Sequence, residues 1–421
     1  MASPFLRAFR HRNYRLFFGG QLISLTGTWM QRTAQDWLVL TLPGGGGTAV
    51  GITTAMQFLP LLLFGMYGGV LADRFPKRRL LMVTQAVMGM LALILGLLVI
   101  TGTAQVWHVY VLAFALGATT VLDNPTRQTF AVEMVGKKDL QNAVALNSAT
   151  FNLGRILGPA IAGTLIALVG TGTVFLLNAG SFVAVLVGLK LMNPRELHTV
   201  TPLPRAKGQL REGLRYIAGR RDLSLLLVLI AFVATFAMNS QITNALMSKQ
   251  VFHSGAESFG LASTAIAVGA VIGALLSARR GYPRKRLLLS AAALFSLLDV
   301  AAGLSPWYWL FLVLLVPTGI TMMTLNNTAN ATMQLSVSPE IRGRVMSVYL
   351  VVFMGGNPVG APAIGWISEM FGARWSLIGG GLIATTAAVG VAIALSRVRG
   401  VKVRPRFRPR PHLQVVPVRE G

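Results

Sequence analysis

The sequence contains no cysteine, which excludes disulfide bridges and thiolate metal sites. It is also poor in charge: 12% of its 421 residues are Asp, Glu, Lys or Arg, whereas soluble domains carry about 25%. Acidic residues are the scarcer sign, with 13 Asp and Glu against 38 Lys and Arg. The sequence shows no nucleotide-binding loop, metal-ligand cluster or nucleophile constellation. These absences argue against an enzyme, an ATP-driven pump and a metal site.

Long apolar runs are what the sequence has instead. Hydrophobic residues make up 53% of the chain, with a mean hydropathy of +0.62, and the apolar windows reach the length of about 20 residues that spans a bilayer. We therefore expect an all-α polytopic membrane protein with twelve transmembrane helices. Their expected ranges are 16–42, 50–72, 80–100, 107–123, 142–169, 173–192, 223–248, 259–278, 287–303, 307–332, 345–371 and 375–395.

The cations lie in the gaps between apolar runs and favour one side. Alternating connections collect almost every Lys and Arg, while the opposite set carries only Lys249 and Arg374. By the positive-inside rule, this pattern predicts an inner-membrane protein with both termini in the cytoplasm, next to the anionic leaflet. The net charge of +25 would suggest nucleic acid binding only if the cations shared one face of a soluble domain. No nucleic acid partner is therefore expected.

One sequence pattern occurs twice, at positions separated by about half the length of the chain. The basic hairpin Gly69 to Leu81 has a weaker echo at Gly273 to Leu287, also between apolar runs. We expect an N-terminal six-helix half (1–192), a cytoplasmic linker (193–222), a C-terminal six-helix half (223–396) and a basic, disordered cytoplasmic tail (397–421). The second part of the linker can form an amphipathic helix on the membrane surface.

Three groups of residues resemble the major facilitator superfamily. Gly69-x-Leu71-Ala72-Asp73-Arg74, followed by Lys77, Arg78 and Arg79, resembles its signature between helices 2 and 3, with Pro76 in place of the usual second glycine and Ser277 in place of the aspartate in the second half. Gly154, Gly158, Pro159 and Gly163 match the helix 5 motif of its exporters, in which small residues let helices pack closely. The third group resembles the branch of enterobactin-type siderophore exporters and macrolide or multidrug efflux proteins, a similarity that covers nearly all of the chain except the tail. Its residues are Gln21, Ser24, Gly27, Trp29, Gln31, Trp37, Pro125, Arg127, Asn142, Ala143, Leu146, Asn147 and Arg155.

This resemblance implies the fold and the function. Two pseudo-symmetric six-helix halves would rock about a central site and act as a monomeric secondary transporter without a cofactor. The resemblance favours proton-coupled efflux of amphipathic small molecules. A dedicated siderophore or metabolite exporter is an alternative, and a non-transporting membrane receptor or scaffold is a third. The arginine that many proton-coupled drug exporters carry four residues before a helix 4 glycine is replaced here by Ala113, before Gly117.

Charged residues inside the apolar runs are candidates for proton coupling, because a charge at mid-membrane is costly. Arg32 and Asp36 are four residues apart on one helix face, so Asp36 could bind a proton in exchange for Arg32 or a cationic substrate. A static salt bridge near the outer interface is the alternative. Arg155 could recognise an anion, pair with Asp36 or bind helix carbonyls. Asp299 is expected to be structural.

The remaining candidates are a substrate cavity and a conformational gate. In the gate, Asp73 would cap the start of helix 11 when the cytoplasmic side closes, whereas the alternative is that these residues only set topology. Gate candidates are Gly69, Asp73, Arg74, Lys77, Arg78, Arg342 and Arg344. Polar, aromatic and methionine residues on helices expected to face the centre would line an adaptable chamber, with plain core packing as the alternative for the methionines. The cavity candidates are Trp29, Gln31, Phe58, Phe236, Met238, Asn239, Gln241, Met322, Met323, Asn326 and Asn327.

Overall fold

The N-terminal half is built from long helices. A computed structural model describes residues 4–198, 209–280, 284–398, 401–406 and 412–417. Apolar runs between short polar turns form the helices, because a buried or lipid-facing backbone must satisfy its own hydrogen bonds. The elements of this half are η1 (Pro4–Arg10), α1 (Arg12–Thr41), α2 (Gly47–Arg74), α3 (Lys77–Ile100), α4 (Val106–Leu191) and η2 (Pro194–Glu196).

Helix α4 contains 86 residues and is broken at two glycines. Gly136 has φ 69° and Gly170 has φ 81°, a backbone region that glycine adopts without the clash of a Cβ. The breaks leave the pieces 106–135, 137–169 and 171–191, each long enough to span a bilayer. The sequence predicts a helix end at residue 123 and a polar cytoplasmic connection over residues 128–141. Both boundaries are wrong, because the helix accommodates Pro125 and continues to Gly136.

The C-terminal half begins with a helix that changes its winding. Between α6 (Arg221–Phe232) and α7 (Ser240–Leu246) lies the π-helical turn η3 (Val233–Ala237), and a second π-helical turn, η4 (Met247–Val251), follows α7. Such turns leave single backbone groups without the regular helical partner. The remaining helices are α8 (Ala256–Ala278), α9 (Lys285–Leu304), α10 (Tyr308–Leu335), α11 (Pro339–Phe371) and α12 (Ala373–Val398).

The helix lengths agree with the expected number of crossings. Nine helical stretches in the described residues are long and apolar enough to cross a membrane, with α4 counted once and α1 not included. Helix α1 has 30 residues but carries polar and charged side chains along its length. With the three pieces of α4 taken separately and α1 added, the described helices are consistent with twelve crossings.

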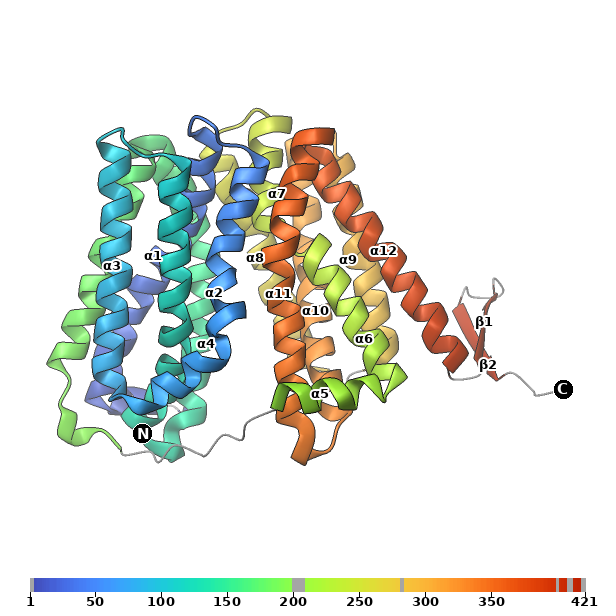
Figure 1. The fold of residues 1–421 in the computed structure, drawn as a ribbon, viewed down its shortest axis with the longest axis horizontal. Helices are drawn as coiled ribbons and strands as arrows, with labels where there is room; N and C mark the ends of the chain where they lie inside the picture. Colours follow the sequence, from blue (N-terminus) through green and yellow to red (C-terminus); the bar gives the residue numbers. More distant parts are fainter. Residues whose placement is uncertain (1–3, 199–208, 281–283, 399–400, 407–411, 418–421) are drawn as a thin grey trace.

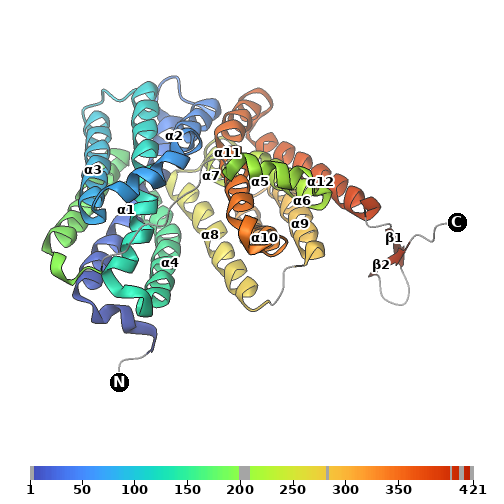
Figure 2. The same cartoon turned by 60° about the horizontal axis from the view of Figure 1, so that its bottom comes forward.

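The two halves stand side by side, and the linker helix α5 (Gln209–Ala218) lies at one edge of the bundle (Figure 1). We call this edge the basic side, because η1, the end of α2, the start of α3 and α5 lie there. The opposite edge, with the α1–α2 turn and the end of α11, is called the neutral side. When the basic side is turned forward, α5 is seen crossing over α10 and α11 (Figure 2).

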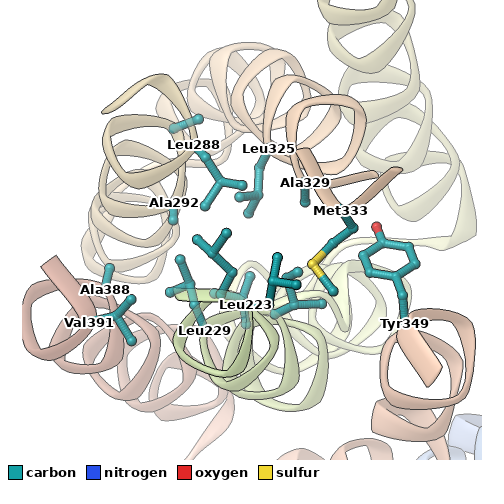
Figure 3. Packing of buried hydrophobic residues seen from close by; sticks show 14 of the residues in the cluster. Leu223, Leu229, Leu288, Ala292, Leu325, Ala329, Met333, Tyr349, Ala388 and Val391 are labelled. Atoms are coloured by element: carbon teal, nitrogen blue, oxygen red, sulfur yellow. The ribbon is translucent and has the colours of Figure 1, made fainter. Parts of the chain in front are cut away.

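Each half has a hydrophobic core of its own. In the C-terminal half, side chains from α6, α9, α10, α11 and α12 meet in one cluster, which Figure 3 shows for Leu223, Leu229, Leu288, Ala292, Leu325, Ala329, Met333, Tyr349, Ala388 and Val391. Another cluster joins the halves, with Leu38 of α1 buried together with Leu246 of α7 and Phe259 of α8. The last two residues lie close to the neutral side, so the halves share a core there.

The C-terminal tail differs from the expectation of disorder. Helix α12 continues to Val398, and β1 (Val401–Arg406) pairs antiparallel with β2 (His412–Pro417). Valines alternate with basic residues at the start of β1, and this two-residue period of β-branched side chains is typical of a strand. The tail therefore contains a hairpin beyond the transmembrane helices.

Candidate functional site

A cavity of about 850 Å³ lies on the inner face of the N-terminal half. Most of its walls come from α1, α2 and α4, while α3 and α11 contribute Met88 and Met354. This volume is in the range of small-molecule sites. The cavity lining includes Gln21, Trp29, Gln31, Arg32, Phe58, Asp123, Arg127, Phe151 and Asn178.

Four of the residues singled out in the sequence line this cavity, namely Trp29, Gln31, Arg32 and Phe58. The ring of Trp29 meets Phe151 edge to face, with centroids 5.6 Å apart. The Gln31 Oε1 atom accepts a hydrogen bond of 2.5 Å from the Nδ2 of Asn178. The cavity wall near Arg32 therefore has an aromatic part, formed by Trp29 and Phe151, and an amide part, formed by Gln31 and Asn178.

The C-terminal candidates do not line this cavity. Phe236 packs against Phe232, with ring centroids 6.1 Å apart, and Asn239 Nδ2 donates to the Thr235 carbonyl. Asn326 and Met238 line a separate pocket of about 10 Å³. Packing within the C-terminal half thus engages these side chains. The other candidates that are outside the cavity lining are Gln241, Met322, Met323 and Asn327, and their role stays a prediction.

Arg32 and Asp36 interact electrostatically one helical turn apart. Within the described residues neither side chain forms a hydrogen bond or a close ion pair. The Arg32 guanidinium carbon lies 5.0 Å from the centre of the Trp29 ring, a cation–π distance. Asp36 is 4% exposed and is not part of the cavity lining. The static salt bridge considered from the sequence is therefore not formed in this structure.

Arg155 and Asp299 lie elsewhere. Arg155 is on the second piece of α4, outside the cavity lining, and beside Ile156, whose carbonyl accepts a hydrogen bond of 3.2 Å from Thr264 of α8. Asp299 is 5% exposed within α9. In the described residues neither makes a hydrogen bond or an ion pair, so the pairing of Arg155 with Asp36 is not present here.

A buried ion pair that the sequence reasoning did not single out lies on the cavity wall. Arg127 pairs with Asp123, one turn earlier on α4, and Asp123 is fully buried. The Asp123 Oδ1 atom also accepts hydrogen bonds from Thr84 at 2.8 Å and Gln85 at 2.7 Å, both on α3. Arg127 donates to Gln21 of α1 at 3.1 Å. This network links α1, α3 and α4 inside the N-terminal half.

The exporter-like motif packs α4 against both halves. A Cβ on Gly158 would lie 2.5 Å from the Trp29 Cβ, so this glycine and Gly154 let α4 approach α1. On the other side, Gly163 and Pro159 face α8, where a Cβ on Gly260 would lie 2.5 Å from the Pro159 carbonyl oxygen. Small residues thus permit close packing within the half and across to its partner half.

Hydrogen bonds close the neutral side. Glu369, near the end of α11, accepts from the Thr48 backbone at 3.0 Å and from the Thr48 hydroxyl at 2.5 Å. Lys249 donates to the Leu40 carbonyl. A Cβ on Gly365 would lie 2.1 Å from the Gly47 carbonyl oxygen, which marks a tight backbone contact between α2 and α11. The halves are thus joined where α1 ends and α2 begins.

On the basic side, the described gate candidates bond within their own half or to the linker helix. Arg78 donates to the carbonyls of Leu189 and Lys190 at 2.7 and 2.9 Å. Arg342 donates to the Gln334 carbonyl at 3.0 Å, and Arg344 pairs with Glu212 of α5. Arg74 is exposed and Lys77 is buried. The surroundings of Gly69 and Asp73 lie outside the described residues, so the gate stays a prediction.

The chain matches one family model over almost its whole length. A family model described as "Transmembrane secretion effector" matches residues 2–418. The chain belongs to this family of major facilitator transporters. Membership makes this transporter a multi-pass protein of the inner membrane, in agreement with its long apolar helices.

Its relatives include several transporters matched over most of their length. The transporter is 25% identical to the staphyloferrin A transporter of Staphylococcus aureus, over 85% of this chain and 90% of that protein. It is 22% identical to macrolide efflux protein A of Streptococcus pyogenes, over 90% of this chain and 96% of that protein. It shares 26% identity with the multidrug efflux pump Tap of Mycobacterium tuberculosis, over 91% of this chain and 94% of that protein. Efflux-type relatives therefore match most of this chain.

Solved structures share the fold. A bacterial homologue of the human lysosomal transporter Spinster, inward-facing and occupied, has a TM-score of 0.68 at 16% identity, covering 91% of this chain and 97% of that one. An inward-facing bacterial homologue of the iron transporter ferroportin gives a TM-score of 0.67 at 16% identity, covering 90% and 98%. At these identities the likeness shows the major facilitator fold of this transporter.

Proposed function

We propose that this transporter exports amphipathic small molecules by alternating access, powered by the proton gradient across the membrane. The observation that carries the proposal is a cavity of about 850 Å³ in a transporter whose halves are joined at the neutral side. The cavity has aromatic walls and a charged arginine, which suits molecules with both apolar and polar parts.

The positive-inside rule gives the orientation in this proposal. The basic side then faces the cytoplasm, together with both termini, and the neutral side faces outward. Closure by Lys249, Glu369 and the glycine contacts would then seal the outer side, so that substrate enters the cavity from the cytoplasm.

Asp36 and Arg32 are the proposed coupling residues. A proton on Asp36 removes the charge that acts on Arg32 one turn away. Since Asp36 lies next to Trp37, which stacks on Phe259 of α8 with centroids 6.2 Å apart, a change in its charge occurs at the contact between the halves. Protonation can therefore bias the equilibrium between inward-open and outward-open states. Arg155, beside the contact with α8, is a further candidate.

The relatives support export and leave two substrate ranges. The macrolide and multidrug efflux relatives favour broad efflux, whereas the staphyloferrin A transporter favours a dedicated siderophore or metabolite exporter. In either case the protein acts as a monomeric transporter with a small-molecule substrate, surrounded by lipid, and needs no cofactor or catalytic residue. A receptor or scaffold role has no use for a charged cavity of this size.

Dye export from cells tests the proposal. Cells producing the wild type, Asp36→Asn or Glu196→Gln would be loaded with an anionic, a neutral and a cationic fluorescent dye, with and without an uncoupler. We expect the wild type to lower the retention of at least one dye, the uncoupler to abolish this effect, and Asp36→Asn to lose it while reaching the membrane. Glu196 is exposed in η2 and serves as the matched acid. Export that is insensitive to the uncoupler would contradict the proposal of broad proton-driven efflux, and so would the absence of export of any dye. A dedicated exporter would then remain as the alternative.

A further inference from the structure

The charge of the cavity is not balanced. Among the described residues that line it, the ionisable side chains are Arg32, Asp123 and Arg127. Two of these are cations and one is an anion. Whether the cavity attracts a cation or an anion therefore depends on which of these three side chains is already paired with other groups of the protein.

Asp123 is fully engaged. One carboxylate oxygen accepts from Thr84 and Gln85, the other from Arg127, and the side chain is fully buried. A carboxylate surrounded by three donors has little capacity left for a cationic ligand. Its partner Arg127 is held by the same ion pair and by Gln21. This pair is therefore internally neutralised.

Arg32 carries the remaining charge. It lies over the Trp29 ring and, in the described part of the chain, has no hydrogen-bond acceptor or close ion pair. Asp36 acts on it only through a longer electrostatic interaction. A guanidinium in a membrane cavity without an acceptor is energetically unfavourable. An anionic ligand that reaches Arg32 would therefore gain binding free energy from this contact.

The surroundings of Arg32 fit the rest of such a ligand. Trp29 and Phe151 form an aromatic pair on the same wall. Gln31 uses its carbonyl oxygen for Asn178, which leaves the amide N–H groups of Gln31 for other acceptors. Guanidinium groups bind carboxylates through two parallel hydrogen bonds.

We propose that Arg32 is the binding subsite for the carboxylate of an amphipathic anionic substrate, whose apolar part packs on Trp29 and Phe151. The inference rests on the proposed function only in taking the cavity as the substrate site. It specifies the substrate class as organic acids, in place of the cationic substrates that an unpaired Asp36 would favour.

Binding of three probes that share one ring system tests this subsite. The probes are 2-naphthoate, 2-naphthamide and 2-naphthylmethylammonium, measured by calorimetry with the full chain in phosphatidylcholine nanodiscs, and empty nanodiscs correct for partitioning into lipid. For the wild type we expect a Kd for 2-naphthoate about tenfold lower than that for the amide, with the ammonium weakest.

Variants assign the preference to Arg32. Arg32→Gln should bring the carboxylate and the amide to within about twofold of each other, and Arg32→Lys should retain part of the preference. Arg15→Gln removes an exposed cation from the same helix and should behave as the wild type. Asp36→Asn should tighten 2-naphthoate binding by about threefold and leave the amide unchanged, because the competing carboxylate charge is gone. This gain of affinity is informative even if Arg32→Gln fails to fold.

Three outcomes would overturn the inference: the amide or the ammonium binding as tightly as 2-naphthoate, no binding of 2-naphthoate at millimolar concentration, or the same preference in Arg32→Gln. These failures are distinguishable from failure of export. Uncoupler-sensitive export of a neutral or cationic dye without carboxylate preference rejects only the anionic class. Carboxylate preference at Arg32 without export of any dye rejects only the export proposal.

Discussion

Lys249 of the C-terminal half donates a hydrogen bond to the Leu40 carbonyl, in the last turn of α1. A cation at the C-terminal end of a helix interacts favourably with the helix dipole, by about 0.3–1 kcal/mol. Lys249→Met keeps most of the apolar stem and removes the charge. We expect it to raise the population of the state that is open on the neutral side by about fivefold, which corresponds to about 1 kcal/mol.

The absence of cysteine in the native sequence makes this shift measurable. Spin labels at Thr41→Cys and Phe371→Cys, both exposed on the neutral side, report the distance between α1 and α11 by pulsed electron paramagnetic resonance. An unchanged distance distribution in Lys249→Met would show that the bond does not hold the halves together.

Glu369 makes the corresponding contact at the start of α2, where it accepts from the backbone and hydroxyl of Thr48. A carboxylate is favourable at a helix N-terminus, so Glu369→Gln should open the neutral side in the same direction as Lys249→Met. The same pair of labels checks this. Glu257→Gln, an exposed acid on the same side, is the control. A shift of equal size in the control would assign the effect to net charge instead of the Thr48 contact.

The Asp123–Arg127 pair should be important for stability. Removing one partner of a buried ion pair costs about 3–5 kcal/mol, and because the Arg127 side chain is 23% exposed, we expect a smaller loss of about 2 kcal/mol for Asp123→Asn. The melting temperature of the purified protein measures this. The double variant Asp123→Asn, Arg127→Gln should lose less than the sum of the single variants, because no charge is left unpaired. Additive losses would contradict direct coupling of the two side chains.

Gly260 allows α8 to approach α4. Its added Cβ would lie 2.5 Å from the Pro159 carbonyl oxygen and 3.0 Å from the Gly163 Cα. Gly260→Ala should therefore push the halves apart and reduce export several-fold by disfavouring the state closed on the neutral side. Gly180→Ala is the matched control, because a Cβ there meets nothing within 4 Å, and it should keep activity and gain up to about 1 kcal/mol of stability. Equal activity of both variants would contradict a tight interface.

Much of the fold could be predicted from the sequence, because apolar runs of bilayer length and basic connections directly report membrane crossings. The ends of helices were less predictable. The expected helix end at residue 123 lies just before Pro125, yet this proline is inside α4, and the break occurs at Gly136. A proline in a membrane helix is tolerated when neighbouring groups satisfy the freed carbonyl, and the sequence does not show those neighbours.

The site was partly predictable. Trp29, Gln31, Arg32 and Phe58 line the cavity. The C-terminal candidates do not, and Phe236 and Asn239 instead contact Phe232 and Thr235, about one turn earlier in the chain. The Asp123–Arg127 pair has the same four-residue spacing as Arg32 and Asp36, and that signal could have identified it. It was missed because Asp123 was placed at a helix end next to water. Its partners Gln21 and Gln85 are isolated amides in apolar runs, which only the tertiary structure brings together.

The tight glycine contacts at the neutral side have a mechanical consequence. Helix α2 contains 28 residues, which at 1.5 Å per residue gives a rod about 42 Å long. Its first turns lie against α11 at Gly47 and Gly51, so we expect them to be the pivot when the halves rotate. A rotation of about ten degrees about this pivot moves the far tip of a rod of that length by about 7 Å. We therefore expect sub-side-chain shifts near Gly47 to produce, at the other end of α2, displacements wide enough to admit or exclude a small molecule.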